Sequence, residues 1–361
     1  MCALVISVVV VFFVAWYGVS YVVENFFEPV DVNDATPIEV TIPSSSSASS
    51  IARILYGACG EENEGLISNT AVFKVYVDFV GKANTMKAGT YVLSKNMTVK
   101  QMVDIICEGN PPKATVTFTV PEGYSIRDIA GVLLNKGLIT SEDALYSVCR
   151  NGDAFRNFAF IDTVAQSDLA SQRDYLLEGY LFPDTYEVYA DASVESILTR
   201  MLNRFNEIFT DAYTIRAQEL GMSMDEVVTL ASLIEREAQA NDDFAKVSAV
   251  FHNRLSSNMP LQSCASLSYV LKVNKYTFTE SELATVSPYN TYLNSGLPAG
   301  PVGNPGKAAI EAALYPNEAY LGEDGYLFFC NGNPQESNEL VFSKTYEEHQ
   351  ENVSKYQQYW S

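Results

Sequence analysis

The chain has 361 residues, enough for two or three domains, and 23 Lys and Arg against 44 Asp and Glu give a formal net charge of −21. This excess of acid argues against nucleic acid as a partner, because phosphate binding needs a clustered basic surface. The 47% hydrophobic and 12% aromatic content excludes general disorder, so most of the chain can form packed cores.

The first segment of the chain is strongly apolar. Residues 3–23 contain no charged side chain, and 21 helical residues reach about 31 Å, enough to cross a bilayer. The alternatives are a buried helix or a cleaved signal, although a signal would have a basic start and a small-residue cleavage site. We predict a single-pass transmembrane anchor over residues 1–27 in the cell membrane. No basic residue precedes Arg53, which permits an extracytoplasmic body.

A pattern of six residues occurs twice, 78 positions apart. Thr41, Pro43, Ser47, Ile51, Ala52 and Leu55 recur as Thr119, Pro121, Ser125, Ile129, Ala130 and Leu133. The pattern is typical of a strand, a proline turn, a serine that begins a helix, and an amphipathic helix. We therefore predict a small α+β module over residues 37–112. A second β–α copy at 116–139 then opens a larger domain over residues 113–361.

The most informative predicted helix runs from about residue 224 to 240, with Ser223 as its cap. At about 100° per residue, Glu237 falls inside the arc of apolar side chains and Glu235 falls outside it. Burial raises the pKa of a carboxyl, which enables a glutamate to donate a proton near neutral pH. The alternative is a structural glutamate, paired with Arg236 or Arg254.

Other kinds of chemistry have little support in the sequence. The six cysteines form no C-x-x-C pair and the two histidines lie far apart, so we expect no metal site and no cofactor. The nucleophile-elbow, phosphate-loop and zinc-protease motifs are absent from the sequence. The rings and amides of the loop over residues 287–298 suit a carbohydrate groove, and equally a plain structural loop.

Several motifs, taken in order, resemble those of the endolytic murein transglycosylase (MltG/YceG-like) family. The motifs are LEGYLFPDTY at 177–186, LASLIEREA at 230–238, VFHNRL at 250–255, MPLQS at 259–263, YNTY at 289–292, GLP at 296–298, NPG at 304–306, YLFF at 326–329 and FSKTYEEH at 342–349. The resemblance covers essentially everything after the apolar segment.

The resemblance implies an α+β fold with an N-terminal transmembrane helix (1–27), a small LysM-like α+β module (37–112) and a larger mixed helical and β catalytic domain (113–361). It implies cleavage between N-acetylmuramic acid and N-acetylglucosamine within nascent peptidoglycan strands, which leaves 1,6-anhydro ends and limits strand length in cell-wall assembly. Peptidoglycan synthases and the division or elongation machinery are the partners that it suggests.

The catalytic residue implied by the resemblance is Glu237, the glutamate that the helical arithmetic also selects. Glu235 is expected to have a supporting role. The residues expected to position the substrate are Glu178, Gln262, Ser263, Asn290 and Tyr292.

Two positions depart from the family pattern. Cys264 stands where many relatives have an acidic residue, which argues against a carboxylate role there. Ser45 of the first β–α copy stands where the second copy has Gly123, so we expect weak or no glycan binding by the first copy. Three other functions remain open, namely a non-catalytic peptidoglycan-binding or division scaffold, a lysozyme-like hydrolase, and a membrane-anchored sensor that binds glycan fragments without altering them.

Overall fold

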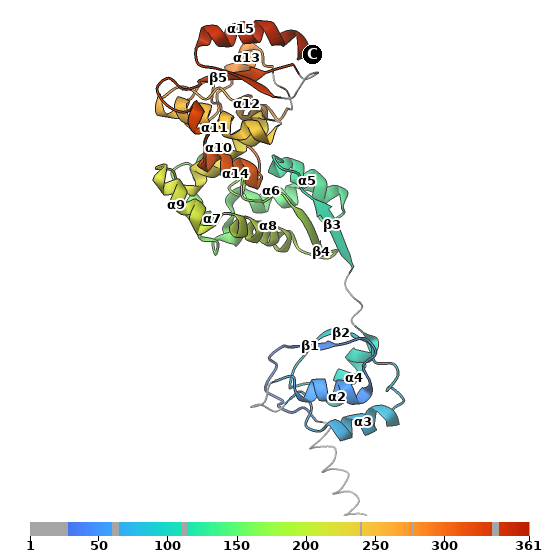
Figure 1. Cartoon of the computed structure of the whole chain (residues 1–361). Helices are drawn as coiled ribbons and strands as arrows, with labels where there is room; N and C mark the ends of the chain where they lie inside the picture. The colour runs from blue at the N-terminus through green and yellow to red at the C-terminus, as the bar shows by residue number, and fades with distance from the viewer. Residues whose placement is uncertain are drawn as a thin grey trace, which may run out of the picture. The chain divides into compact units, whose positions relative to one another are not determined.

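The computed structural model describes residues 28–59, 65–109, 114–238, 240–273, 275, 277–333 and 339–360. The chain divides into two compact units between Ala114 and Thr115 (Figure 1). The sequence placed the domain boundary between residues 112 and 113. Each unit is described by itself below.

The predicted fold class needs one correction. No helix within the described residues is long and apolar enough to cross a membrane. The longest of them, α11 (Asn241–Ser256), has 16 residues, whereas a span needs about 20. The predicted anchor, residues 1–27, lies outside the described residues. The structure supports a mixed fold of helices and strands in two units.

Within its described residues, the first unit packs three helices against one antiparallel pair of strands. Its elements are β1 (Ile38–Ile42), α2 (Ala48–Tyr56), α3 (Thr70–Phe79), β2 (Gly89–Leu93) and α4 (Val99–Glu108). Strands β1 and β2 pair with Ile38 opposite Leu93. Alternate strand residues, such as Val40 and Ile42, are buried together with Ile51 and Leu55 of α2.

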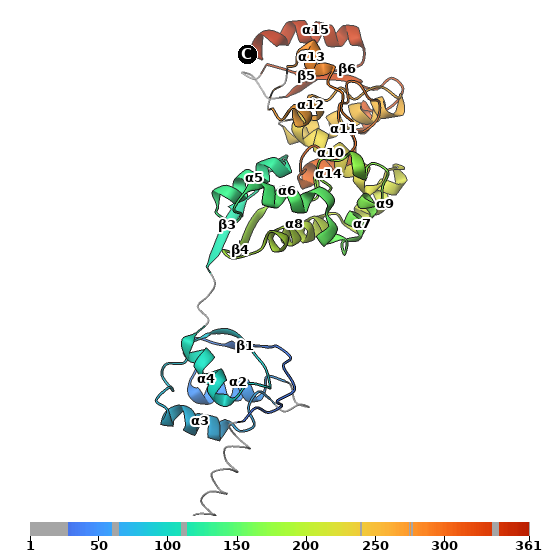
Figure 2. The same ribbon diagram turned by 180° about the vertical axis from the view of Figure 1, so that it is seen from behind.

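The larger unit begins with a similar strand and helix. In chain order its elements are β3 (Thr115–Thr119), α5 (Ile126–Asn135), α6 (Glu142–Asn151), α7 (Ala159–Ala165), β4 (Thr185–Tyr189), α8 (Val194–Ile208), α9 (Asp211–Glu219), α10 (Met224–Glu237), α11, α12 (Cys264–Leu271), α13 (Glu280–Leu283), α14 (Lys307–Leu314), β5 (Phe328–Asn331), β6 (Leu340–Ser343) and α15 (Tyr346–Tyr356). Strand β3 pairs with β4 and strand β5 with β6, both antiparallel. Helix α15 covers the β5–β6 pair (Figure 2).

The two copies of the repeated pattern have the same local structure. Ser47 caps α2 and Ser125 caps α5, each by accepting a hydrogen bond from a backbone N–H in the first turn. The corresponding residues Ser45 and Gly123 are both left-handed, with φ of 62° and 75°. The strand, turn and capped helix predicted from the repeat are therefore confirmed in both copies.

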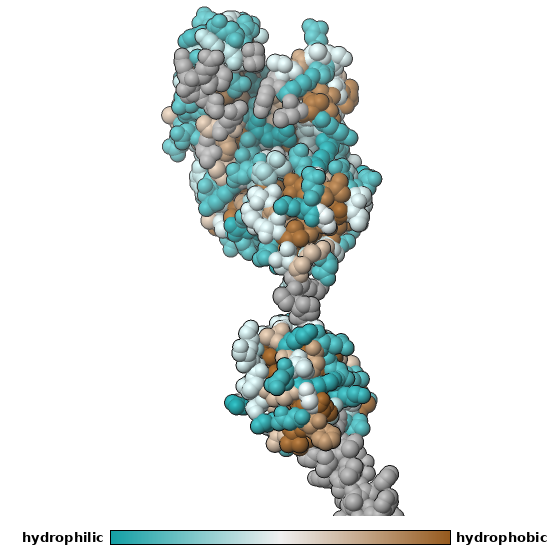
Figure 3. Space-filling view, turned by 90° about the vertical axis from the view of Figure 1, so that its right-hand side faces the viewer, coloured by the Kyte–Doolittle hydropathy of each residue, from teal (hydrophilic) through white to brown (hydrophobic). Residues whose placement is uncertain are grey.

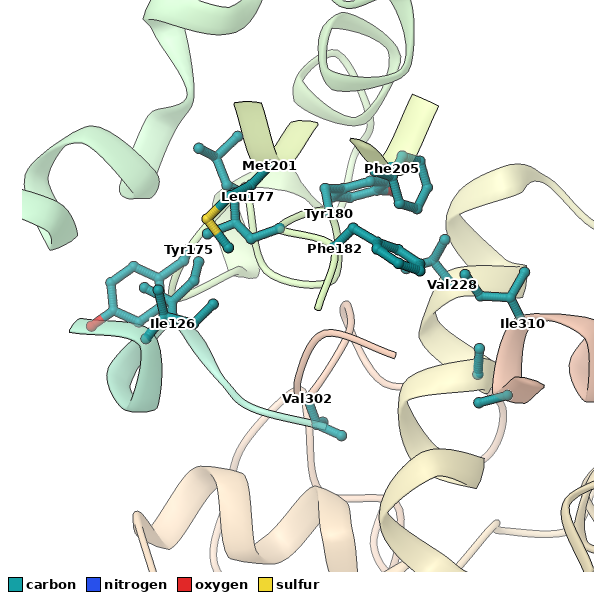
Figure 4. Packing of buried hydrophobic residues seen from close by; sticks show 14 of the residues in the cluster. Ile126, Tyr175, Leu177, Tyr180, Phe182, Met201, Phe205, Val228, Val302 and Ile310 are labelled. Atoms are coloured by element: carbon teal, nitrogen blue, oxygen red, sulfur yellow. The ribbon is translucent and has the colours of Figure 1, made fainter. Parts of the chain in front are cut away.

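A continuous apolar core holds the larger unit together. Tyr180 lies at its centre, edge-to-face with Phe205 of α8 at a ring-centroid distance of 5.1 Å. Figure 4 shows the side chains of Val228 from α10 and Ile310 from α14 near this aromatic group. Every residue of α10 from Val227 to Ile234 is buried. Helix α10 is therefore the central helix of this unit, and the functional site is built at its carboxyl end.

Candidate active site

The amino end of helix α10 is fixed to the core before the site begins. Ser223 and Glu226 form the reciprocal hydrogen bonds of a capping box. Asp225, in the first turn, accepts hydrogen bonds from the buried Arg173 and from the hydroxyl of Tyr180. A charge-assisted pair with an additional hydrogen bond holds this helix in one position. The opposite end of α10 is consequently fixed as well.

Glu237 is the last residue of α10 and is half-buried. Its Oε1 accepts a 2.5 Å hydrogen bond from the hydroxyl of Ser263 and a 3.1 Å bond from the backbone N–H of Ala265. Burial raises the pKa of Glu237 above its usual value, and the two hydrogen bonds partly oppose this effect. A carboxyl of this kind can hold a proton and release it within one reaction cycle.

The residues that surround Glu237 come from two loops joined by hydrogen bonds. We call residues 259–263 the 259–263 turn. The backbone N–H of Gln262 donates to the carbonyl of Thr291, and that of Ser263 donates to Oγ1 of Thr291, both at 3.0 Å. Pro260 and Ser295 form an antiparallel bridge. These contacts hold the 259–263 turn against the loop that contains Tyr292.

Gln262 has a left-handed backbone, with φ of 51°, and an exposed side chain. This conformation is unfavourable for a residue that has a Cβ, and strained residues concentrate at functional sites. Its neighbour Ser263 is only 1% exposed, so its hydroxyl is committed to Glu237. From the sequence, both residues were predicted to position the substrate. In the structure Gln262 is exposed, whereas Ser263 is buried.

Cys264 and Tyr292 lie beside the catalytic candidate. The Sγ of Cys264 lies 3.2 Å from the hydroxyl oxygen of Tyr292, and both side chains are half-buried. Burial and the nearby Glu237 raise the pKa of Cys264 to about 11, so it remains a neutral thiol at neutral pH. Burial also raises the pKa of Tyr292, which remains a neutral phenol.

Glu178 is completely buried, at 0% exposure. Its carboxyl accepts hydrogen bonds from the backbone N–H of Ile126 (3.0 Å), the hydroxyl of Tyr269 (3.1 Å) and the side-chain amide of Asn304 (3.1 Å). Burial raises its pKa to about 8. In this position Glu178 joins α5, α12 and the NPG motif, and it can affect a substrate only through these neighbours.

Asn290 is also 0% exposed and serves its own loop. Its side-chain amide donates to the carbonyls of Leu283 (2.9 Å) and Thr285 (2.8 Å), and its Oδ1 accepts from the backbone N–H of Tyr292 (2.9 Å). All of its hydrogen-bonding groups therefore have protein partners. Asn290 shapes the loop that presents Tyr292.

Glu235 has a position that the helical arithmetic did not predict. Its Oε2 accepts a 2.9 Å hydrogen bond from the backbone N–H of Gly306, directly before α14. Burial and the nearby Glu122 raise its pKa to about 7. Like Glu178 at α5 and Glu237 at α12, this carboxyl lies at the amino end of a helix, where the helix dipole favours negative charge. No sequence pattern links Glu235 to Gly306, because the contact is long-range.

The two arginines proposed as structural partners bond elsewhere. Arg236 donates to the carbonyl of Val302 at 3.1 Å. Arg254 donates to backbone carbonyls and to Gln262. Neither forms an ion pair with Glu237 in the described part of the chain. The hydroxyl of Ser263 and the backbone N–H groups of Cys264 and Ala265 are hydrogen-bond partners of this carboxylate.

The surface of the larger unit is hollowed at one end. Figure 3 shows this hollow between two lobes, with hydrophilic residues inside it. It lies at the end of the unit where Figure 1 places α13, β5 and α15. Over the residues that the structure covers, no three His, Cys, Asp or Glu side chains are grouped closely enough to hold a metal ion.

Comparisons with known proteins identify the family. The pattern of the YceG-like family matches residues 40–355. A Bacillus subtilis protein named endolytic murein transglycosylase is 32% identical over 337 residues, which cover 92% of this chain and 88% of the relative. A Streptococcus pneumoniae protein of the same name is 29% identical over 358 residues. This match covers 94% of the chain and 62% of that relative, so the chain spans less than two thirds of the pneumococcal protein.

A solved structure leads to the same family. The crystal structure of a YceG-like protein from Listeria monocytogenes is 32% identical in sequence, with a TM-score of 0.58. The alignment covers 87% of this chain and 98% of the Listeria chain. The resemblance first seen in the ordered motifs is therefore confirmed, and this chain belongs to the YceG-like family.

Proposed function

We propose that this protein is an endolytic peptidoglycan lytic transglycosylase. It cleaves the bond between N-acetylmuramic acid and N-acetylglucosamine within nascent glycan strands. The products carry 1,6-anhydro-N-acetylmuramic acid ends, and the cleavage limits strand length in cell-wall assembly. The names of the relatives in Bacillus and Streptococcus support this class of reaction.

One observation carries the proposal, namely the environment of Glu237. Its carboxyl is half-buried, has a raised pKa, and is held by one hydroxyl and by backbone N–H groups at the start of α12. Protonated, Glu237 donates its proton to the glycosidic oxygen as that bond breaks. The carboxylate that results then accepts the proton of the sugar's C6 hydroxyl while this oxygen attacks the anomeric carbon.

This mechanism needs one carboxyl, whereas ordinary glycosidases use two that flank the bond. In the part of the chain that the structure describes, no second carboxylate shares the hydrogen-bond partners of Glu237. The nearest glutamate in sequence, Glu235, bonds to Gly306 instead. The internal C6 hydroxyl replaces an activated water, and its fixed position near the anomeric carbon supplies a large proximity advantage.

The predicted substrate-positioning residues form two groups, those that reach the surface and those that are buried. The exposed Gln262 and the half-buried Tyr292 are proposed to contact the sugar rings, and Ser263 to orient Glu237. Glu178 and Asn290 are proposed to act indirectly, because both are fully buried. The neutral phenol of Tyr292 suits contact with an uncharged sugar, because it offers a ring face and a hydroxyl.

The setting of the reaction is also a proposal. Peptidoglycan strands are assembled outside the cytoplasm, so we propose that the larger unit works on the extracytoplasmic side of the cell membrane. Peptidoglycan synthases and the division or elongation machinery are proposed partners. The first unit is proposed to be a LysM-like module, and its strand and serine-capped helix support this assignment.

The test is a digestion of peptidoglycan with the purified chain, followed by mass spectrometry of the products. Anhydro ends are the expected result, and the Glu237→Gln variant is expected to give none. Reducing ends would instead identify a lysozyme-like hydrolase. Binding without any cleavage, unchanged by Glu237→Gln, would identify a non-catalytic scaffold.

A further inference from the structure

Arg254 is a buried cation whose hydrogen-bond partners within the described residues are neutral groups. It lies on α11, is 7% exposed, and forms no ion pair with any described carboxylate. Burial lowers its pKa from the usual value, which shows that the charge is costly to keep in this position. A charge retained at such a cost needs an explanation in the groups around it.

The guanidinium of Arg254 joins three parts of the site. Its Nη1 donates to the carbonyls of Pro260 (3.1 Å) and Leu261 (2.9 Å), and it lies 3.3 Å from Oε1 of Gln262. Its Nε donates to the carbonyl of Leu327 at 2.7 Å. A planar fork with fixed donor directions can hold several acceptors at once, which an ammonium group cannot do equally well.

The aromatic ring of Phe328 completes this arrangement. The guanidinium carbon of Arg254 lies 5.1 Å from the centroid of the ring, within the range of a cation–π contact. Phe328 begins β5, whereas Pro260 and Gln262 belong to the 259–263 turn. Arg254 is therefore the side chain through which α11 ties this turn to β5.

The charge of Arg254 also acts on the reacting groups. The carboxylate of Glu237 attracts the guanidinium, which raises the pKa of Arg254 and partly offsets the effect of burial. Besides Ser263 and the backbone N–H of Ala265, the polar or titratable groups around Glu237 are Arg236 on its own helix and Cys264 at the start of α12. Cys264 and Tyr292 are neutral at neutral pH. Arg236 lowers the pKa of Glu237, and the attraction between Glu237 and Arg254 favours the carboxylate in the same direction.

We propose that Arg254 is a positioning residue for the cleavage reaction, which holds the 259–263 turn in place and stabilises the carboxylate that Glu237 becomes after it donates its proton. This inference rests on the proposed function. Arg254 would make two separate contributions, one through the planar shape of its guanidinium and one through its positive charge. Replacement by lysine removes the first and keeps the second, whereas replacement by glutamine removes both.

The experiment compares Arg254→Lys and Arg254→Gln on peptidoglycan strands, with kcat, KM and the pH profile measured for each. We expect Arg254→Gln to lower kcat roughly 100-fold, as misplaced catalytic groups do. The alkaline limb of its pH profile should move to higher pH, because a lost cation raises the pKa of Glu237. Arg254→Lys should lower kcat to a smaller extent. The alkaline limb of its pH profile should stay at the pH found for the wild type. A rise in KM of similar size in both Arg254 variants, with kcat unchanged, would overturn the proposal.

Two controls keep the result interpretable. Arg216 on α9 also donates to a backbone carbonyl, that of Leu314 at 3.1 Å, and Arg216→Lys and Arg216→Gln should leave kcat and the pH profile unchanged. Hydrogen exchange over residues 259–265 gives a readout that needs no activity. We expect faster exchange in both Arg254 variants and not in the Arg216 variants.

These measurements also distinguish a failure of the proposal for Arg254 from a failure of the proposed function. If the wild type makes no anhydro products, the proposed function fails, whereas the exchange result still tests the hold on the 259–263 turn. If the wild type is active and Arg254→Lys matches it in kcat and in exchange, the proposal for Arg254 is wrong. If Arg254→Gln does not fold, Arg254→Lys still tests whether the guanidinium holds the 259–263 turn, and unchanged kcat and exchange in that variant would overturn the proposal.

Discussion

Ser263 donates a 2.5 Å hydrogen bond to Glu237, so the residue before helix α12 meets the last residue of helix α10. The catalytic candidate is thus held by two helix ends at once. Since α10 is fixed at its other end by Asp225 and Arg173, small changes near Ser263 should affect the chemistry more than the fold.

Glu237→Gln should abolish strand cleavage. Glutamine keeps an oxygen that can accept from Ser263 and Ala265, so the fold should persist, but it has no proton to donate. The expected loss of kcat is about 10²- to 10⁴-fold, the usual value of a general acid. The measurement is the rate at which anhydro ends appear, with thermal unfolding as the check on folding. Retained activity in a folded variant would remove Glu237 from the mechanism.

Glu235→Gln should behave differently, although it makes the same substitution two positions away. Its carboxyl bonds to Gly306 at the start of α14 and shares no partner with Glu237. We expect kcat within about threefold of the wild type, and a loss of stability of about 1 kcal/mol from the weakened helix cap. Chemical denaturation beside kinetics measures both quantities. A loss of kcat as large as that of Glu237→Gln would give Glu235 a direct role.

Ser263→Ala should shift the pH profile of cleavage to higher pH. The serine hydroxyl bonds to the charged form of Glu237 and lowers its pKa, so removing the hydroxyl raises that pKa. Because the general acid must be protonated, the alkaline limb of kcat/KM against pH should shift to higher pH. Ser256→Ala on α11, which removes a similar side-chain bond to the carbonyl of Asn253, is the control. A shift to lower pH would contradict the assignment.

Gln262→Gly should weaken substrate binding without loss of stability. Glycine adopts the left-handed φ of 51° without steric cost, which offsets its greater freedom in the unfolded chain. The exposed amide is lost, so KM should rise roughly tenfold, as expected for a lost hydrogen bond. Asn258, also left-handed with φ of 53°, supplies the control Asn258→Gly. Equal KM values for the two variants would exclude Gln262 from the substrate site.

Glu178 should make the fold less stable as pH rises. Its pKa is about 8 in the folded chain against 4.5 as the ordinary value, so the folded state binds more protons between these pH values than the unfolded state. The free energy of unfolding should therefore fall from pH 5 to pH 8, by roughly 3 kcal/mol. Glu178→Gln cannot titrate, and it should flatten this part of the curve. Urea denaturation at several pH values tests this, and equal slopes for both proteins would contradict it.

Local structure could be predicted from the sequence where the signal is local. The capped helix at Ser223 and the two copies of the strand and serine-capped helix follow from patterns within about 20 residues, and the structure contains them. The helix predicted to end near residue 240 ends at Glu237, because Ala238 is extended. Helix ends depend on tertiary partners, here the start of α12.

The arrangement of the site depended on contacts that no local pattern records. Glu178 and Asn290 belong to motifs of the family, but the motifs do not reveal that both are fully buried. The helical arithmetic placed Glu235 outside the apolar arc because it cannot anticipate the arrival of α14 from 71 residues further on. The surroundings of α10 decide which of its polar residues reach solvent, and they come from distant segments.

The pairing of β3 with β4 has a consequence for how this chain can be divided. Strand β1 finds its partner within the first unit, whereas the second copy obtains its partner strand from residues 185–189 of the larger unit. A genetic cut after residue 139 would separate β3 from β4 and leave both edges unpaired. The second copy is consequently not a transferable module by itself, and the junction at Ala114 is the natural place to exchange or delete a domain.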